Sequence, residues 1–211
     1  MVDGEQKPAR ERILETAAEL FYREGIRAVG VDTIIARSGV AKMSLYRNFA
    51  SKDELVCAYL EGIEERYRAW WERVTARHPG DPKAQLKALF TALGHWIERP
   101  GFRGCPFIST AVEFRDHDHP GRAIVQAHRR GVRARLRALA AEAGATDPDR
   151  LAGHLQLLME GAYAGGGVLG PEDTGAAAVS AAEALIEAAC AAPPGGASGA
   201  GAGCANATPR G

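Results

Sequence analysis

The chain has 211 residues, of which 46% are hydrophobic and 25% are charged, as in an ordinary water-soluble globular protein. Basic and acidic side chains number 26 each, so the formal net charge is zero and any surface that binds nucleic acid or a membrane has to be local. No apolar run is long enough to span a bilayer and the charged N-terminal stretch lacks a signal-peptide core, so we expect a cytoplasmic protein with no membrane partner.

The first three predicted elements are helices that are separated by glycines. One has an apolar face over residues 13–21 and ends at Gly25, and two short helices follow at residues 31–38 and 42–49. Gly39 permits the tight turn between the two short helices. A longer helix followed by two short ones around a glycine turn is the arrangement of a helix-turn-helix module.

The remaining predicted elements are helices as well. Ser51 and Glu54 form a capping box that begins a long helix, which the sequence HPGDP stops. Five further helices are predicted, at residues 82–98, at 106–114, from the RDHDHPG loop to 143, from DPDR through 162, and at 172–192. Residues 193–211 are mostly Gly, Ala, Ser and Pro, which predicts a disordered tail. The fold class is therefore all-α, with about nine helices.

The two short helices have residues that suit DNA recognition. Leu45 and Phe49 are spaced to be buried with Ile34 and Val40, so the rest of the third helix points outward. These outward residues offer a cation, a hydroxyl, an amide and a phenol to phosphates and base edges: Lys42, Met43, Ser44, Tyr46, Arg47 and Asn48. A solvated helix face carries the same residue types, so single residues do not identify a DNA contact.

The string VDTIIARSGVAKMSLYRNFASKDEL, residues 31–55, resembles the N-terminal signature of the TetR/AcrR family of transcriptional regulators. That signature runs through an Ile-Ala helix, Gly-Val, a Leu-Tyr-x-x-Phe recognition helix and Ser-Lys-x-x-Leu, and the resemblance covers residues 10–60. Ala41 departs from it where a capping Ser or Thr is common, and Ile35 stands where a small residue is frequent.

The resemblance implies the role of each matching residue. Lys42, Ser44 and Arg47 would approach bases or phosphates in the major groove. Backbone phosphates would be contacted from the second helix, the third helix and the start of the long helix, by Thr33, Arg37, Tyr46 and Lys52. Residues 1–52 would form the helix-turn-helix domain and residues 53–192 the effector-binding and dimerisation domain. We expect double-stranded operator DNA as the partner and repression as the default.

A homodimer on a palindromic operator is expected, because one such module reads few base pairs. Small residues of the last two helices allow close helix approach in a four-helix interface, namely Gly161, Ala162, Gly165, Gly166 and the alanine-rich helix up to 192. The alternative is that these small residues pack inside one subunit.

The resemblance also implies that the C-terminal helices enclose a pocket for a small effector. The aromatic residues there favour a largely apolar or aromatic effector, with His154 or Glu113 as polar groups, although each side chain also fits a plain core position. The residues expected to bind the ligand are Tyr67, Trp70, Trp71, Trp96, Phe102, Cys105, Phe107, Phe114, His154, Met159 and Tyr163.

Cys105 suggests an alternative function, in which the protein senses a reactive compound through a thiol. It precedes Pro106, so it is the predicted N-cap of a helix, and the helix N-terminus together with Arg103 would lower its pKa. This chemistry fits an oxidant or electrophile sensor, and a structural turn beside the pocket is the other interpretation. An all-α enzyme that uses Cys105 with a histidine, and an adaptor that binds DNA and protein without a ligand, are the rival classes.

Two further stretches have less specific interpretations. The basic run at 129–137 has an apolar stripe, which indicates a solvated helix surface rather than a second nucleic-acid site. The histidines and aspartates of the loop at 116–119, with His128, fit a helix start better than a metal site. The four cysteines form no CxxC pair, so we expect free thiols, no metal and no cofactor.

Overall fold

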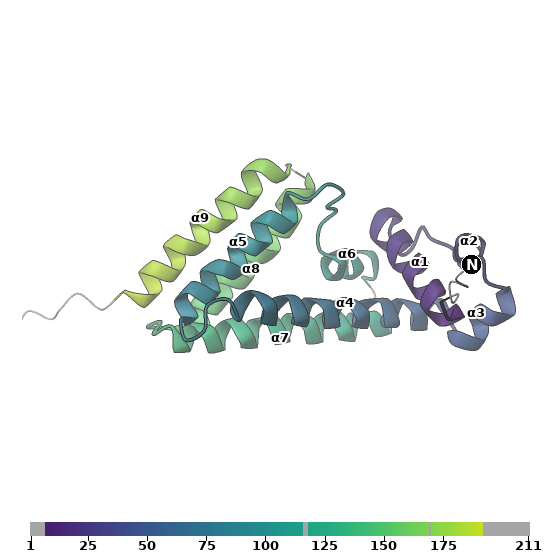
Figure 1. The fold of residues 1–211 in the computed structure, drawn as a ribbon, viewed down its shortest axis with the longest axis horizontal. Helices are drawn as coiled ribbons and strands as arrows, with labels where there is room; N and C mark the ends of the chain where they lie inside the picture. The colour runs from purple at the N-terminus through teal and green to yellow at the C-terminus, as the bar shows by residue number, and fades with distance from the viewer. Residues whose placement is uncertain (1–6, 116–117, 169, 192–211) are drawn as a thin grey trace, which may run out of the picture.

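The computed structural model describes residues 7–115, 118–168 and 170–191. Within these ranges the chain forms nine helices and no strand, which confirms the all-α prediction (Figure 1). The helices are α1 Ala9–Glu24, α2 Val31–Ser38, α3 Lys42–Asn48, α4 Lys52–Thr75, α5 Pro82–Ile97, α6 Pro106–Glu113, α7 Pro120–Glu142, α8 Pro148–Val168 and α9 Pro171–Cys190. The tail predicted to be disordered, residues 193–211, lies outside the described residues. Along the described ranges no helix is both long and apolar enough to cross a bilayer.

The predicted breaks between helices have a local chemical cause. Gly25 ends α1 with φ 89°, and its N–H donates to Phe21 O at 3.1 Å. Gly39 ends α2 in the left-handed region with φ 64°, which an L side chain rarely adopts. Ser51 Oγ accepts the N–H of Glu54 at 3.1 Å, as the capping box requires. The Glu54 carboxylate accepts from Ala50 N–H at 2.6 Å, one residue before Ser51.

The first three helices, which we call the N-terminal head, pack around one hydrophobic cluster. Ile34, Leu45 and Phe49 are almost completely buried in it together with residues of α1. The cluster continues beyond residue 52 into the first turns of α4 and includes Phe107 of α6 and Val125 of α7. A cut after residue 52 would therefore divide a continuous core.

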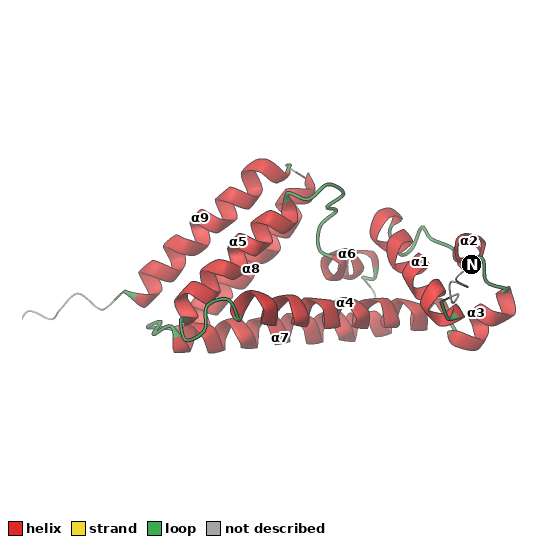
Figure 2. Cartoon of the chain, in the orientation of Figure 1, coloured by secondary structure: helices red, strands yellow, loops and turns green. Residues whose placement is uncertain are grey.

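The remaining helices form a second core. Helices α5, α8 and α9 lie side by side as an inclined layer, and α4 and α7 run along its base (Figure 2). Gly94 of α5 and Gly175 of α9 let these two helices approach closely, since a Cβ on Gly175 would lie 3.3 Å from the Gly94 Cα. Part of the small-residue face thus packs inside one subunit. The tertiary arrangement holds the head at one end of α4 and leaves a cavity between α4, α5, α6, α7 and α8.

Candidate functional site

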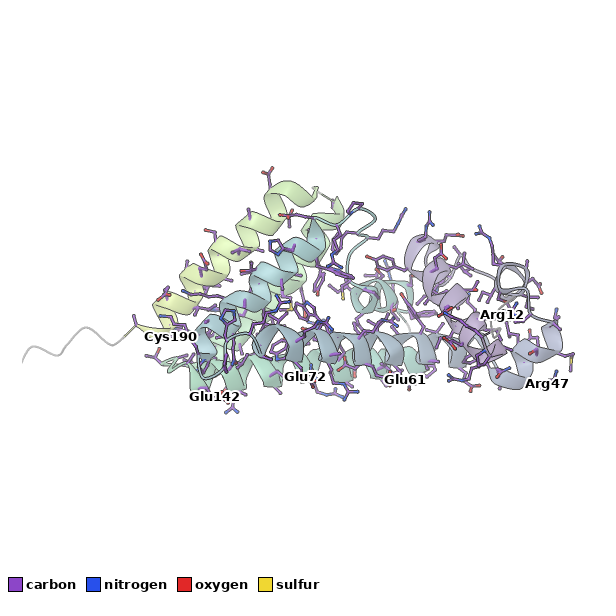
Figure 3. All side chains as sticks on the ribbon, in the orientation of Figure 1. Arg12, Arg47, Glu61, Glu72, Glu142 and Cys190 are labelled. Carbon is purple, nitrogen blue, oxygen red and sulfur yellow. The ribbon has the colours of Figure 1, made fainter. Side chains whose placement is uncertain are left out.

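Helix α3 presents the surface that the sequence predicts for DNA. Its Leu45 is buried, whereas Met43 is 69% exposed and Tyr46 is 43% exposed. Lys42 and Arg47 are also exposed, and Figure 3 shows Arg47 at the outer end of the head. The structure therefore points four of the six predicted α3 side chains into solvent, on the side opposite the core.

The other predicted DNA-contacting residues differ in exposure. Ser44 and Asn48 are half-buried, and Asn48 Nδ2 donates to the Ser44 carbonyl at 2.8 Å. Thr33 and Arg37 are exposed on α2. Lys52 is half-buried at the start of α4, where burial lowers the pKa of its amine.

Contacts inside the head hold α3 in place. Lys42 Nζ pairs with Asp32 Oδ1 at 3.3 Å, across the exposed face of α2 and α3. Arg12 of α1 donates to the carbonyls of Ser38 at 2.6 Å and Gly39 at 3.1 Å, which fixes the turn before α3. The sequence gives no sign of this role of Arg12, because only the tertiary structure brings its side chain next to a residue 26 positions away. At the N-cap of α3, Ala41 supplies no side-chain acceptor.

A cavity of about 980 Å³ lies between α4, α5, α6, α7 and α8, and side chains of α1 close one side of it. Most of its wall is aromatic or aliphatic. Seven of the residues predicted to bind a ligand line it, namely Tyr67, Trp70, Trp96, Cys105, Phe107, Met159 and Tyr163. Tyr67 Oη lies 3.7 Å from Met159 Sδ, and burial raises the pKa of the Tyr67 hydroxyl. The cavity wall at this point is therefore neutral.

Four predicted ligand-binding residues do not line the cavity. Trp71 is buried in the helical core, with the Arg135 guanidinium 5.9 Å from its ring. Phe102 stacks on Tyr163, which is itself in the wall. Phe114 lies past the end of α6 and stacks on His119. His154 is exposed to solvent on α8. Aromatic character and helical spacing did not distinguish a cavity wall from a core or an outer face.

Glu113, expected as a polar group of the pocket, does not line this cavity. Its carboxylate accepts from the backbone N–H of Ile26 at 3.0 Å and of Arg27 at 2.6 Å. The segment just before α6 is attached to the head as well, because Arg103 N–H donates to Tyr22 Oη at 2.9 Å. Helix α6 therefore lies in the cavity wall, and both its last residue and the segment that precedes it are bound to the head.

His128 is a polar group of the cavity wall that was not among the predicted ligand-binding residues. Its ring stacks on Phe107 with centroids 3.7 Å apart, and its Nδ1 forms a hydrogen bond with Glu64 Oε2. Arg135 lies 3.4 Å from the same carboxylate. Burial lowers the pKa of His128, and it outweighs the opposing effect of Glu64. The two residues are 64 positions apart, so no sequence motif could have revealed the pair.

Cys105 caps α6 by position, but its chemistry is not the one predicted. Burial raises the pKa of its thiol, although the N–H groups of Ile108 and Phe107 act to lower it. Arg129, and not the exposed Arg103, is the cation that acts on it. The expected reactive thiolate is therefore disfavoured. Cys105, Cys57 and Cys190 are free thiols, and Cys204 lies outside the described residues.

The loop before α7 starts a helix, as predicted. His119 is the N-cap, and its Nδ1 accepts the N–H of Gly121 at 3.0 Å. Asp116 and His117 lie outside the described residues, and among the described side chains no group of three His, Cys, Asp or Glu could hold a metal ion.

The basic run at 129–137 is largely paired. Arg129 meets Glu160 at 2.9 Å and Arg137 meets Asp149 at 2.8 Å. Arg133 donates to the Asp149 carbonyl at 2.6 Å. These contacts bind α7 to α8, so most of these arginines serve the packing of two helices.

Comparison with known proteins gives two matches to protein families. Residues 13–59 match the family described as bacterial regulatory proteins, tetR family, and residues 82–182 match the family described as tetracyclin repressor-like, C-terminal domain. A crystal structure of a TetR-family transcriptional regulator from Streptomyces coelicolor is 34% identical with a TM-score of 0.84, covering 87% of this chain and 96% of that one. A TetR transcriptional regulator from Chloroflexus aurantiacus is 29% identical with a TM-score of 0.75, covering 84% and 93%.

Curated relatives match over a shorter length. The transcriptional repressor KstR2 of Mycobacterium tuberculosis is 34% identical over 97 residues, which are 46% of this chain and 48% of the relative. The transcriptional activator FasR of Mycolicibacterium smegmatis is 35% identical over 98 residues, 45% of this chain and 44% of the relative. The match thus spans about half the length of these relatives. All of these proteins are transcriptional regulators and not enzymes, which contradicts the enzyme alternative.

Proposed function

The chain belongs to the TetR family of bacterial transcriptional regulators, and we propose that it is a homodimeric repressor that a small effector releases from a palindromic operator. The observation that carries this proposal is the position of α6. This helix contributes Pro106 and Phe107, and its N-cap Cys105, to the cavity wall and binds the head through Glu113. A molecule that fills the cavity therefore touches the element that holds the DNA-reading helices.

DNA recognition is assigned to the exposed face of α3. Arg47 and Lys42 supply positive charge, and Tyr46 supplies a hydroxyl on an exposed ring. Thr33 and Arg37 flank this face on α2, and Lys52 follows it at the start of α4. Met43, which is 69% exposed, suits an apolar contact such as a thymine methyl group.

Dimerisation is assigned to the outer face of α8 and α9. Leu157 and Val168 of α8 are large apolar side chains that are 71% and 82% exposed. Exposed apolar side chains on one helix are typical of a surface that another protein covers. A Cβ on Gly161 would meet nothing within 4 Å, so a second subunit could approach there closely. Two other small residues of this helix, Ala162 and Gly166, face inward because they are buried, and Gly165 is half-buried.

Contacts of α6 couple the cavity to the head. An effector that displaces Phe107 or Ile108 moves α6 as a rigid unit, because the backbone hydrogen bonds of this short helix hold its residues together. Glu113 then carries the displacement to Ile26 and Arg27 of the head. In a dimer the spacing of two heads must match the helical repeat of DNA, so a small shift of each head is enough to lower affinity.

The proposal is tested by selecting bound fragments from genomic DNA and footprinting them at fixed salt. We expect protection of an inverted repeat with half-sites about 34 Å apart or a multiple of that distance. Apolar and aromatic compounds are then screened for release. Protection without two-fold symmetry would contradict the assignment of a dimer. A ligand that binds the cavity and leaves the DNA affinity unchanged would contradict release by an effector and would favour an adaptor that binds DNA and protein.

A further inference from the structure

The charges around the cavity are not balanced. One of its charged groups is already neutralised, because Arg129 pairs with Glu160 at 2.9 Å, and burial lowers the pKa of His128 and so disfavours its charged form. Three arginines of the lining, Arg66, Arg73 and Arg99, form no ion pair with any carboxylate in the described ranges. The lining thus has an excess of positive charge, whereas the rest of its surface is mostly apolar.

The three arginines, which we call the basic rim, share a position at the solvent side of the cavity. Each is exposed, whereas Phe107, Met159 and the core-facing wall are buried. Arg66 and Arg73 are seven residues apart, close to two helical turns, so they project from the same face of α4. Arg99 follows α5, and its guanidinium lies 5.0 Å from the exposed ring of Trp96.

From this arrangement we propose that the cavity takes an amphipathic organic anion, with an apolar or aromatic body in the cavity and an anionic head at the basic rim. The inference rests on the proposed effector role of the cavity and adds the chemical class of the ligand. Burying a charged head would be costly, whereas a head at the exposed rim stays hydrated. A guanidinium matches a carboxylate, phosphate or sulfonate with two parallel hydrogen bonds, and the apolar wall takes the body.

The experiment compares two probes with the same ring system and different charge. The anion 8-anilinonaphthalene-1-sulfonate and the neutral N-phenyl-1-naphthylamine are titrated into the full chain, and their fluorescence gives the dissociation constants. We expect the anion to bind about tenfold more tightly or better, because charge-assisted hydrogen bonds favour it. Decanoate should likewise displace the bound anionic probe at lower concentration than decanamide, which extends the result to a carboxylate head and an aliphatic body.

Variants assign the preference to the basic rim. The combined change Arg66→Gln, Arg73→Gln and Arg99→Gln should weaken the anionic probe about tenfold and change the neutral probe by less than about twofold. The matched control is Arg77→Gln, which alters an exposed arginine just past α4 that does not line the cavity. Ala69→Trp, on the exposed side of the lining, should weaken both probes by occupying space, which shows that they bind here.

Two results would overturn the inference. One is equal affinity of the wild-type protein for both probes, and the other is a triple variant that weakens both probes equally. Either result leaves the proposed function standing, because a neutral effector would still bind the cavity. Failure of both probes to bind the wild-type protein, or binding that Ala69→Trp leaves unchanged, would instead count against the effector site itself.

Discussion

Gly166 in α8 shows how a single side chain would disturb the packing of the helical core. A Cβ there would lie 2.4 Å from Ile97 Cγ2 and 3.0 Å from Phe102 Cε1. Ile97 is completely buried, so its branched side chain has no free space into which it could move. The absence of a side chain at this position is therefore required by the close contact between α8 and the end of α5.

We predict that Gly166→Ala lowers the free energy of unfolding by about 1–3 kcal/mol, since overpacking outweighs the better helix propensity of alanine. Gly131→Ala is the matched control, because that site in α7 has nothing within 4 Å of an added Cβ and should become slightly more stable. Urea unfolding at one protein concentration measures both. Equal stability of the two variants would show that α8 can move away from α5.

His128 gives the protein a pH-dependent stability. Burial holds its pKa below the ordinary value, so the unfolded chain binds this proton at higher pH than the folded chain does. Its contribution is thus fully present above about pH 6.5 and is lost as the pH falls below that value. We predict that His128→Phe, which can keep the stack on Phe107, reduces the loss of Tm between about pH 7.5 and about pH 5.5. Coinciding pH profiles of the variant and the wild type would refute this.

At the scale of elements, α6 connects the cavity with the head. Phe107 is buried in the cluster of the head, and it also lines the cavity. Glu113 sits at the other end of this helix, half-buried beside the turn between α1 and α2. Since this helix has only eight residues, a shift at Phe107 has no flexible segment in which to be absorbed before it reaches Glu113.

We predict that Glu113→Gln loosens the turn after α1, because an amide oxygen carries no charge and cannot accept from two N–H groups as strongly as a carboxylate. The backbone amides of Ile26 and Arg27 should then exchange with solvent about tenfold faster. Hydrogen exchange followed by NMR measures this. Glu24→Gln changes a nearby exposed carboxylate and serves as the control. Unchanged exchange at Ile26 would remove Glu113 from the coupling.

For the whole molecule, the sequence predicts the helices and their order closely. The reason is local: prolines and glycines, together with the Ser51 cap, mark helix ends through backbone geometry that needs no tertiary information. The short helices α2 and α3 were predicted within one residue at each end. The exposed face of α3 could be predicted for the same reason, because Leu45 and Phe49 fix which face of this helix is buried.

The cavity was predicted only in part, because its residues are assembled from distant segments. Trp70 and Trp71 are adjacent in α4, yet one lines the cavity and the other lies in the core. Both side chains are tryptophans, and only the tertiary packing of the other helices around α4 separates them. The Glu64–His128 pair and the Glu113 contact are likewise products of tertiary structure. No periodicity within one helix contains that information.

We propose that the exposed face of α3 binds operator DNA. The most direct test of this proposal is the dissociation constant of a labelled operator fragment, measured by fluorescence anisotropy at fixed salt. Arg47→Ala should weaken binding by about 1–3 kcal/mol and Tyr46→Phe by a smaller amount, whereas Arg77→Ala should leave binding unchanged. All three side chains are exposed, so the fold should be retained in each variant. Wild-type affinity in a folded Arg47→Ala variant would contradict the assignment of α3 as the DNA-reading helix.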